Sequence, residues 1–375
     1  MMRRILAVFG TRPEAVKMWP VVDALRADGS FQVRLLATAQ HRDMLDDVLR
    51  VLDMPPDHDL NVMTENQKLA DVTAQCVTGI DRILRAEAPA LVLAEGDTTT
   101  VLAAALAAYY NRIPFGHVEA GLRTEDKYAP FPEEMNRRLA GALTDLHFAP
   151  TPRARENLLR EGIAPETIHV CGNPVVDAVR RIAARDATTT LPDAIEALLT
   201  RVARPVLVTA HRRESFGAPL ESVCQALREI VDADPGVGII FPVHPNPNVR
   251  GPVTARLGGH ERILLVEPLD YLQFIQVMKR VRLILSDSGG VQEEAPSLRK
   301  PVLVLREKTD RPEGIAAGVA RLVGTDRERI VREAQRLLGS AEEYDRMVAA
   351  TNPYGDGQSG PRIAAIIHTY LGGAR

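Results

Sequence analysis

The chain has 375 residues, of which 45% are hydrophobic and 25% are charged, and its formal net charge is −3. No apolar run approaches the roughly 20 residues that a membrane-spanning helix requires, and no block of lysine or arginine indicates a nucleic-acid-binding surface. The three cysteines are far apart and show neither metal-ligand spacing nor an even disulfide framework. We therefore expect a cytoplasmic protein of two domains that binds no membrane and no nucleic acid and holds any anionic ligand in a local pocket.

The first half of the chain alternates short apolar runs with longer segments of helical period. The runs predict buried strands at residues 5–9, 33–37, 90–94, 114–118 and 146–149. The basic and then apolar start resembles a signal peptide, but it continues into Thr11-Arg12-Pro13-Glu14 without a small-residue cleavage site, so we interpret it as the first strand. Strands that alternate with helices predict an α/β domain with a parallel sheet.

The second half repeats this alternation, with strands predicted at residues 206–209, 238–242, 263–266, 283–286 and 302–305. Turn residues in Cys171-Gly172-Asn173-Pro174 place the boundary between two doubly wound, Rossmann-like domains near Gly172. After a glycine-rich break at residues 354–360, a last helix is predicted at about residues 361–371, and it could pack on either domain.

Unusual polar clusters follow six of the predicted strands. They are Gly10-Thr11-Arg12-Pro13-Glu14, Glu95-Gly96-Asp97-Thr98-Thr99-Thr100, His117-Val118-Glu119-Ala120-Gly121, His211-Arg212-Arg213-Glu214, His244-Pro245-Asn246-Pro247-Asn248 and Asp287-Ser288-Gly289-Gly290. In open α/β sheets, ligands bind beyond the carboxyl ends of the strands, where helix N-termini favour anions. If the two domains face each other across a cleft, these clusters are expected to converge on it.

Each cluster alone also has a structural explanation. Asp97 and Thr98 are residue types that often cap a helix before an apolar run, and His211 could be a hydrogen-bonded histidine at a strand end. Six such clusters on the same side of two sheets favour a ligand site instead. The segment 119–138 is the most informative, because a solvated loop would explain its charges but not its Phe131-Pro132 pair.

Two glycine-rich stretches lead to opposite conclusions. Small residues at Ser288-Gly289-Gly290 let backbone amides approach an anion at a helix start, which indicates a phosphate cradle, with a tight turn capped by serine as the alternative. Residues 355–360 match the dinucleotide-binding pattern but follow no strand, and we reject them as a cofactor site. Because the sequence also lacks a P-loop motif and zinc-ligand spacing, we predict no cofactor and no metal.

These clusters, in this order, resemble the non-hydrolysing bacterial UDP-N-acetylglucosamine 2-epimerases along essentially the whole chain. The resembling stretches are residues 9–18, 96–100, 117–124, 209–217, 286–297 and 311–313. The resemblance implies a glycosyltransferase-B-type fold, with Rossmann-like domains of residues 1–171 and 172–358 facing across a cleft and a C-terminal helix, residues 359–375, that packs back on the N-terminal domain. It also implies a homodimer that reversibly converts UDP-N-acetylglucosamine to UDP-N-acetylmannosamine, a precursor of cell-surface polysaccharides.

The implied reaction requires carboxylates and no redox cofactor. The hydrogen on C-2 of the sugar has no adjacent carbonyl to make it acidic, so the family's route is elimination of UDP to a 2-acetamidoglucal, followed by re-addition with a proton on the opposite face. Positioned acid–base groups and positive groups are therefore expected. By motif position, the resemblance implies Asp97, Glu119 and Glu133 as acid, base and charge-stabilising carboxylates, with His211 near the diphosphate. Which carboxylate serves which face stays open.

The resemblance also implies residues that bind UDP-N-acetylglucosamine and UDP. The N-terminal domain would supply Arg12, Lys17 and Arg137. The C-terminal domain would supply Ser288, Gly289 and Gly290 at the phosphates, Glu294 at the ribose, Phe274 at the uracil and Arg311 in the sugar and phosphate pocket. For Phe274 a place in the core is an equal alternative, because it lies on an apolar run.

Some family members have a second, activating site formed partly by a segment that resembles Gln40-His41-Arg42. Asp43 and Asn66 differ from the residues of regulated members, which speaks against regulation, and Trp19 and Glu95 also replace residues more common in the family. Three other functions stay open: a hydrolysing relative that releases N-acetylmannosamine and UDP, a glycosyltransferase of the same fold, and a non-catalytic UDP-sugar-binding protein.

Overall fold

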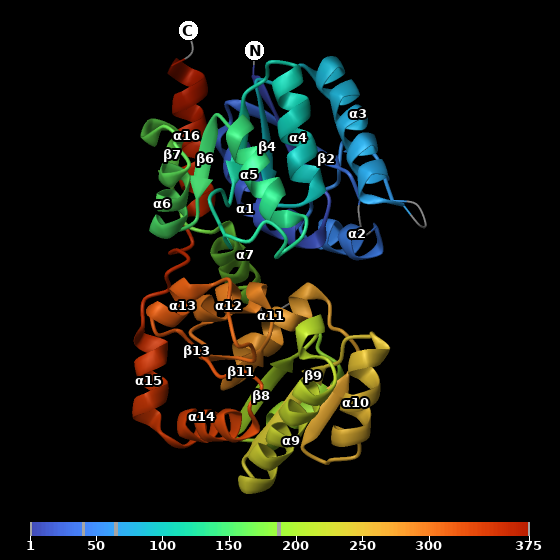
Figure 1. Ribbon diagram of the computed structural model, residues 1–375, viewed down its shortest axis with the longest axis vertical. Coiled ribbons are helices and arrows are strands. Elements are labelled where there is room, and N and C mark those ends of the chain that lie inside the picture. Colours follow the sequence, from blue (N-terminus) through green and yellow to red (C-terminus); the bar gives the residue numbers. More distant parts are fainter. Residues whose placement is uncertain (1, 40–41, 64–66, 186–188, 374–375) are drawn as a thin grey trace. The chain divides into compact units, whose positions relative to one another are not determined.

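The computed structural model describes residues 2–39, 42–63, 67–185 and 189–373. Contacts divide the chain into an N-terminal unit, Met1–Ala178 with Tyr354–Arg375, and a C-terminal unit, Val179–Pro353 (Figure 1). Each unit contains one parallel sheet flanked by helices, which confirms the predicted α/β class with two Rossmann-like domains. The predicted domain limits at residues 171–172 and 358–359 stay predictions.

Among the helices that the structure describes, none is both long enough and apolar enough to span a membrane.

The sheet of the N-terminal unit has seven parallel strands in the order β3-β2-β1-β4-β5-β6-β7. The strands are β1 (Arg3–Phe9), β2 (Phe31–Ala37), β3 (His58–Asp59), β4 (Leu91–Glu95), β5 (Phe115–Val118), β6 (Leu146–Ala149) and β7 (Ile168–Val170). Every residue of β4, β5 and β6 is buried, as strands covered by helices on both faces must be.

The helices of the N-terminal unit follow the strands in alternation. They are α1 (Arg12–Asp28), α2 (Arg42–Val51), α3 (Leu69–Glu87), α4 (Thr99–Tyr110), α5 (Glu133–Leu143), α6 (Pro152–Arg160) and α16 (Ser359–Gly373), and α7 (Pro174–Ala183) crosses the division between the units. Helices α3 and α4 pack together over the sheet face that carries Leu6, Val8 and Val92. A short 3₁₀ turn, Pro165–Thr167, precedes β7.

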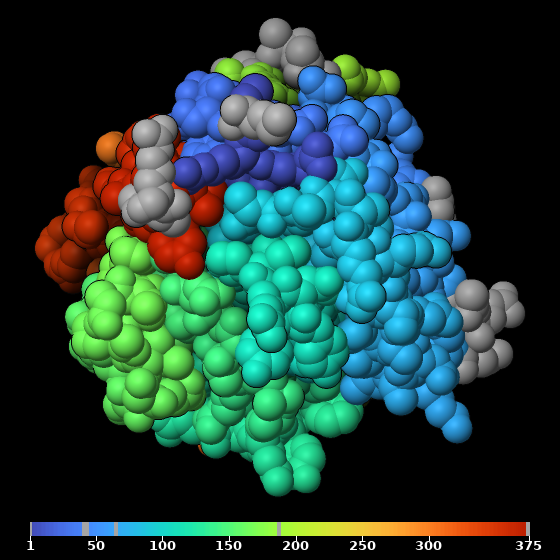
Figure 2. Space-filling model, turned by 90° about the horizontal axis from the view of Figure 1, so that it is seen from above, coloured from blue at the N-terminus to red at the C-terminus, as the bar shows by residue number. Residues whose placement is uncertain are grey.

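The C-terminal helix α16 packs against α1, and Figure 2 shows its red residues beside the dark blue N-terminal segment. Gly360 approaches the Pro20 carbonyl so closely that a Cβ atom would lie 2.4 Å from that oxygen, which only glycine permits. The buried Asp177 carboxylate accepts hydrogen bonds from the amides of Ser359 (3.2 Å) and Gly360 (3.0 Å). The first amides of this helix, within the glycine-rich pattern at residues 355–360, are thus satisfied by the chain itself.

Replacing Asp177 with alanine is expected to destabilise the N-terminal unit. Two buried amides would lose their acceptor, at a cost of about 1–3 kcal/mol each for the unmade hydrogen bonds. Urea unfolding followed by the fluorescence of Trp19, the only tryptophan of the chain, would measure the loss. Asp193→Ala, at an exposed position of the other unit, is the control, and equal stability of the two variants would contradict the prediction.

The C-terminal unit has six parallel strands in the order β10-β9-β8-β11-β12-β13. They are β8 (Arg204–Thr209), β9 (Val237–Pro242), β10 (Ile263–Val266), β11 (Leu283–Ser286), β12 (Val302–Val304) and β13 (Ala320–Leu322). The helices are α8 (Asp193–Arg201), α9 (Ala218–Ala233), α10 (Pro247–Leu257), α11 (Tyr271–Arg280), α12 (Gly289–Glu294), α13 (Pro312–Ala316), α14 (Arg327–Gly339) and α15 (Ala341–Ala349). Helices α9, α10 and α14 contribute to one core with Val206, Val208 and Phe241.

Both sheets reverse their strand order at one point. The reversal lies between β1 and β4 in the N-terminal unit and between β8 and β11 in the C-terminal unit. At such a switch point the loops after the two strands diverge to opposite faces and leave a crevice at the carboxyl ends, where doubly wound folds bind ligands. The predicted clusters after β1 and β4, and those after β8 and β11, begin at these two points.

Candidate active site

Lys17 of α1 contacts two of the predicted polar clusters of the N-terminal unit. Its Nζ atom lies 3.0 Å from Oε1 of Glu95, the last residue of β4, and 2.5 Å from Oε2 of Glu119, which follows β5. Strand β4 is hydrogen-bonded to both β1 and β5, so the loops that follow these strands are neighbours. We call Lys17, Glu95 and Glu119 the Lys17 cluster.

Glu119 has an unusual backbone conformation and two polar partners. Its φ is +64°, a region that side chains other than glycine rarely adopt and that is concentrated at functional sites. Its Oε2 accepts a hydrogen bond from Asn173 Nδ2 at 2.7 Å as well as from Lys17, and the residue is 6% exposed. The carboxylate is therefore held in one place at the end of β5.

Asp97, two residues beyond β4, pairs with Arg137 of α5. Arg137 Nη2 donates to Asp97 Oδ2 at 2.5 Å, and Asn136 Nδ2 donates to the Asp97 carbonyl at 2.9 Å. The Asp97 side chain is 25% exposed. Two residues that the sequence predicted separately thus form one ion pair, whose carboxylate remains accessible.

The neighbouring glutamates at the start of α5 differ in environment. Glu134 is fully buried and accepts from the amide of Thr124 (3.1 Å) and from Arg137 (3.2 Å). Glu133, the predicted catalytic residue, is half-buried, and its side chain has no hydrogen bond or ion pair with any residue that the structure describes. The same holds for the half-buried Arg12 at the start of α1. Both side chains remain available to a ligand.

Glu14 is a buried carboxyl group at the start of α1. Its Oε2 accepts from the amides of Gly10 (2.5 Å) and Thr11 (3.0 Å), which forms a capping box with Thr11. Burial raises the pKa of Glu14 to about 7, although the hydrogen bonds from these two amides oppose the shift. Glu14 thus exchanges a proton near neutral pH.

In the C-terminal unit, His211 and Asp287 join the loops that follow β8 and β11. His211 Nδ1 lies 3.0 Å from Asp287 Oδ1, and Asp287 Oδ2 accepts from the amides of His211 (2.7 Å) and Arg212 (2.8 Å). Burial alone would raise the pKa of Asp287, but His211 and these two amides outweigh it and lower the pKa. An ionised Asp287 therefore orients the His211 ring and leaves its Nε2 edge for other partners, because the ring stays 36% exposed.

The predicted phosphate cradle lies at the start of α12. Ser288 occupies the N-cap position, but its hydroxyl makes no capping hydrogen bond to the described residues, which removes the main support for a serine-capped turn. The Ser288 amide donates to Ser286 Oγ at 3.0 Å, and Gly290 is exposed. A Cβ atom on Gly289 would lie 3.6 Å from the Asp310 carboxylate, an ordinary contact, so no close approach within the chain explains the glycine there.

The remaining predicted binding residues of this unit are only partly accessible. Glu294 is 8% exposed and accepts from the Tyr271 hydroxyl at 3.0 Å. Arg311 is 9% exposed, with its Nε paired with Glu293 and its Nη1 3.1 Å from Asp310 Oδ2. Phe274 is half-buried on α11, which places it outside the fully buried core.

A model of the family described as UDP-N-acetylglucosamine 2-epimerase matches residues 23–368. The chain belongs to this family. The UDP-N-acetylglucosamine 2-epimerase of Salmonella typhimurium is 53% identical over 98% of this chain and 99% of its own, and that of Escherichia coli K12 is 50% identical over 96% and 97%. The fold also matches the Neisseria meningitidis UDP-GlcNAc 2-epimerase bound to UDP-GlcNAc, with a TM-score of 0.89, 42% identity and coverage of 98% and 100%. The S. aureus MnaA–UDP complex gives a TM-score of 0.90 at 43% identity and covers 99% and 97%.

Membership in the epimerase family agrees with the predicted resemblance, and the solved structures confirm the glycosyltransferase-B-type pair of Rossmann-like domains. Several residues that contact the predicted site residues were not assigned a role from the sequence, among them Glu95, Glu134, Asn136, Asn173 and Asp287, and neither was the buried Glu14. Glu14 had a detectable signal in the Thr11-x-x-Glu14 capping box. Asn173 was used only to locate a turn, and nothing local indicated that its side chain reaches Glu119, 54 residues away.

The predicted activating segment includes Gln40, His41 and Asn66, which lie outside the described residues, and so does the side chain of Asp43.

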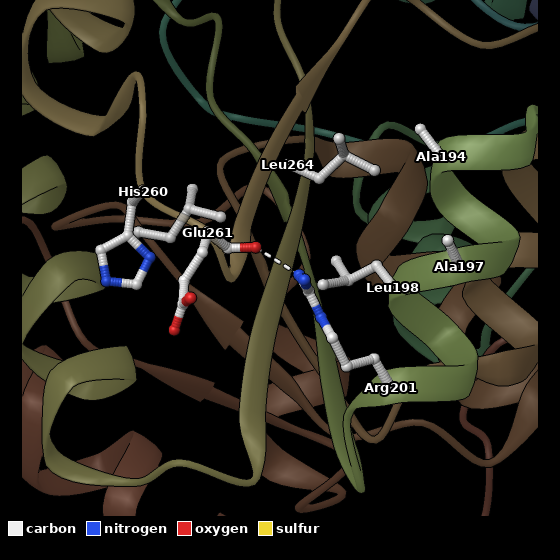
Figure 3. A pocket seen from close by; sticks show the side chains of 8 residues that line it. Ala194, Ala197, Leu198, Arg201, His260, Glu261 and Leu264 are labelled. Atoms are coloured by element: carbon white, nitrogen blue, oxygen red, sulfur yellow. Dashed lines mark hydrogen bonds between the residues drawn. The ribbon is translucent and has the colours of Figure 1, made fainter.

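A cavity of about 280 Å³ lies between α8 and the start of β10, lined by Leu198, Arg201 and Glu261 among others (Figure 3). Arg201 donates there to the Glu261 carbonyl. Because it adjoins the amino end of β10, it lies away from the strand ends that bind ligands in such sheets.

Proposed function

We propose that the chain interconverts UDP-N-acetylglucosamine and UDP-N-acetylmannosamine without net hydrolysis. The observation that carries this proposal is the environment of Glu119 in a member of the epimerase family. Its carboxylate stands at the carboxyl end of a central strand, at positive φ, between an ammonium and an amide donor. A carboxylate fixed in this way is suited to proton transfer with a bound substrate.

The proposed reaction begins with elimination. A carboxylate removes the proton from C-2, and the electron pair of the C–H bond forms the C-1=C-2 double bond. The C-1–O bond breaks at the same time, and UDP leaves with the electron pair of that C–O bond. In the return step, a UDP oxygen bonds to C-1 while a carboxylic acid delivers a proton to the opposite face of C-2. Atoms and electrons balance in both steps without an oxidant, a reductant or water.

Three carboxylates of the N-terminal unit are proposed to act on the sugar: Asp97, Glu119 and Glu133. Proton delivery to both faces of C-2 requires at least two groups in different positions, and these residues come from three separate segments, after β4, after β5 and at the start of α5. Arg137 keeps Asp97 in place, and Glu133 has no competing partner among the described residues. The assignment of each carboxylate to one face is left open.

The C-terminal unit is proposed to bind UDP. His211, oriented by Asp287, would donate to the diphosphate and stabilise the charge that develops as UDP departs. The amides at Ser288, Gly289 and Gly290 and the guanidinium of Arg311 would contact the phosphates, Glu294 the ribose hydroxyls, and Phe274 the uracil. From the N-terminal unit, Arg12 and Lys17 would add positive charge. The homodimer, the cytoplasmic location and the supply of cell-surface polysaccharide precursors stay predictions.

Incubation with UDP-N-acetylglucosamine in D₂O is the experiment that tests the proposal. Each passage through the glucal exchanges the C-2 proton with solvent, so one deuterium is expected at C-2 of both epimers. Nuclear magnetic resonance would follow the label, the formation of UDP-N-acetylmannosamine and the concentration of UDP.

The outcomes separate the proposed epimerase from its alternatives. UDP that accumulates together with free N-acetylmannosamine would identify a hydrolysing enzyme. Sugar transfer to an added acceptor without exchange at C-2 would identify a glycosyltransferase. Binding of UDP-N-acetylglucosamine with neither exchange nor turnover would leave a sugar-nucleotide-binding protein.

A further inference from the structure

Glu95 is a buried carboxyl group that the proposed reaction does not use. It is the last residue of β4, is 2% exposed, and lies 3.0 Å from Lys17 Nζ. Within the described part of the chain, Lys17 is the only hydrogen-bond or ion-pair partner of the Glu95 carboxyl group. Glu119, by contrast, has the closer contact with Lys17, at 2.5 Å, and the additional donor Asn173 at 2.7 Å. Lys17 therefore contacts two carboxyl groups, and the Glu119 carboxylate has more hydrogen-bond donors around it than the Glu95 carboxyl group has.

The charges of the Lys17 cluster do not balance if both carboxyl groups are ionised. Two carboxylates and one ammonium would leave a net negative charge in a buried site, which is unfavourable unless a proton neutralises it. Burial raises the pKa of Glu95 well above its ordinary value, Lys17 opposes this shift, and repulsion from Glu119 and Glu14 adds to it. Protonation of one carboxyl group makes the cluster neutral.

The better-supported carboxylate should keep its charge. Glu119 accepts from two side-chain donors, and each hydrogen bond to a charged carboxylate favours its ionised form. Glu95 has only the longer contact with Lys17, so the excess proton resides on Glu95. We propose that Glu95 is a positioning residue that holds this proton, so that Glu119 alone carries the negative charge beside Lys17 and can accept a proton from the substrate. The inference rests on the proposed epimerase function.

The proposed proton on Glu95 is not consumed in the reaction. Glu119 exchanges its proton with C-2 of the sugar, while the Glu95 O–H bond stays intact through both steps. As the pH rises through the raised pKa of Glu95, this group would lose its proton and compete with Glu119 for Lys17. Turnover should then decrease.

The charged groups around Glu95 are few and can be named. Lys17 and Glu14 face it from α1, and Glu119 faces it from the segment after β5. His117 on β5, whose Nε2 lies 2.7 Å from the Gly96 carbonyl, is neutral at the pH of interest because burial lowers its pKa to about 4. Glu14 also titrates in the range of the assay, because burial raises its pKa to about 7, but Glu95→Gln retains Glu14 and removes only Glu95. A difference between the pH profiles of the wild type and the variant therefore reports on Glu95.

Glu95→Gln, a neutral residue of nearly the same shape, tests the proposal in the full-length protein. The measured quantities are kcat and kcat/KM for UDP-N-acetylglucosamine between pH 6 and pH 10. At pH 7 we expect the variant to remain within about threefold of the wild type, because glutamine mimics the protonated acid. The alkaline decrease of the wild type should move up by one pH unit or more, or disappear. Glu333→Gln, which removes a carboxyl group paired with Arg321 in the other unit, should leave the profile unchanged.

Superimposable profiles of the wild type and Glu95→Gln would overturn the proposal, as would a wild type without an alkaline decrease. A loss of more than about tenfold at pH 7 would also overturn it, because the ionised form of Glu95 would then be required. A purely structural role predicts an equal loss at every pH. Trp19 fluorescence would verify that the variant is folded.

A second measurement does not depend on activity. The side-chain carboxyl carbon of Glu95 can be identified in ¹³C-labelled protein as the resonance that is missing from Glu95→Gln. Because burial raises the pKa of Glu95, we expect this resonance to titrate well above the ordinary glutamate range. Titration within the ordinary range would overturn the proposal even in an active enzyme. If the protein showed no epimerisation while this resonance titrated high, the proposed function would fail and the protonation of Glu95 would stand.

Discussion

Replacing Glu119 with glutamine is expected to lower kcat for epimerisation by about 10²- to 10⁴-fold, the range that a positioned acid–base group contributes. The glutamine oxygen can still accept from Lys17 and Asn173, so the side chain should keep its place and the fold should be retained. What the variant loses is the ability to exchange a proton with C-2. Both the formation of UDP-N-acetylmannosamine and the uptake of deuterium at C-2 should fall together.

Glu161→Gln provides the matched control for this variant. Glu161 is a paired glutamate of the same unit, with its Oε2 2.7 Å from Arg123 Nη2, and it belongs neither to the Lys17 cluster nor to the Asp97–Arg137 pair. We expect its activity to remain within about twofold of the wild type, because Glu161 is not one of the candidate site residues and the glutamine oxygen can still accept a hydrogen bond from Arg123. Retention of more than a tenth of kcat in Glu119→Gln would contradict the assigned role of Glu119.

Most of the fold could be predicted because its central strands are buried on both faces. Ten strands were expected from apolar runs, and all ten are present with ends that differ by at most two residues. The three strands that were missed, β3, β7 and β13, have only two or three residues and carry polar or exposed side chains. Strands β3, β7 and β13 lie at sheet edges, where one side has no neighbouring strand and less apolar surface has to be buried.

The positions of the candidate site could also be predicted, but its internal contacts could not. The polar clusters stand at the carboxyl ends of β1, β4, β5, β8, β9 and β11, as the alternation of strands and helices indicates. Which side chains meet depends on packing between distant segments. Asn173 reaches Glu119 across 54 residues, and Asp287 meets His211 across 76. Likewise, nothing in the Glu133-Glu134 pair shows locally that the second is the buried one.

Replacing Glu14 with glutamine is expected to stabilise the N-terminal unit above pH 7. Burial raises the pKa of Glu14 from 4.5 to about 7, so the folded state binds a proton that the unfolded state releases. The corresponding stability is fully present below pH 4.5 and decreases as the pH rises through the folded-state pKa near 7. A shift of this size corresponds to about 3 kcal/mol at 1.36 kcal/mol per pH unit. At pH 8 the wild type is therefore destabilised by the buried negative charge of Glu14, which the neutral glutamine lacks.

Urea unfolding at pH 5 and pH 8 measures this difference. Trp19 is the only tryptophan, is buried, and lies on the same helix as Glu14, so its fluorescence reports on the affected unit. At pH 5 the free energies of unfolding of the wild type and Glu14→Gln should be similar, because the glutamine oxygen still accepts from the amides of Gly10 and Thr11. At pH 8 the variant should be the more stable by about 3 kcal/mol. Glu328→Gln, at an exposed position, should show no such difference, and a Glu14→Gln variant no more stable than the wild type at pH 8 would mean that Glu14 is ionised in the folded protein at little cost.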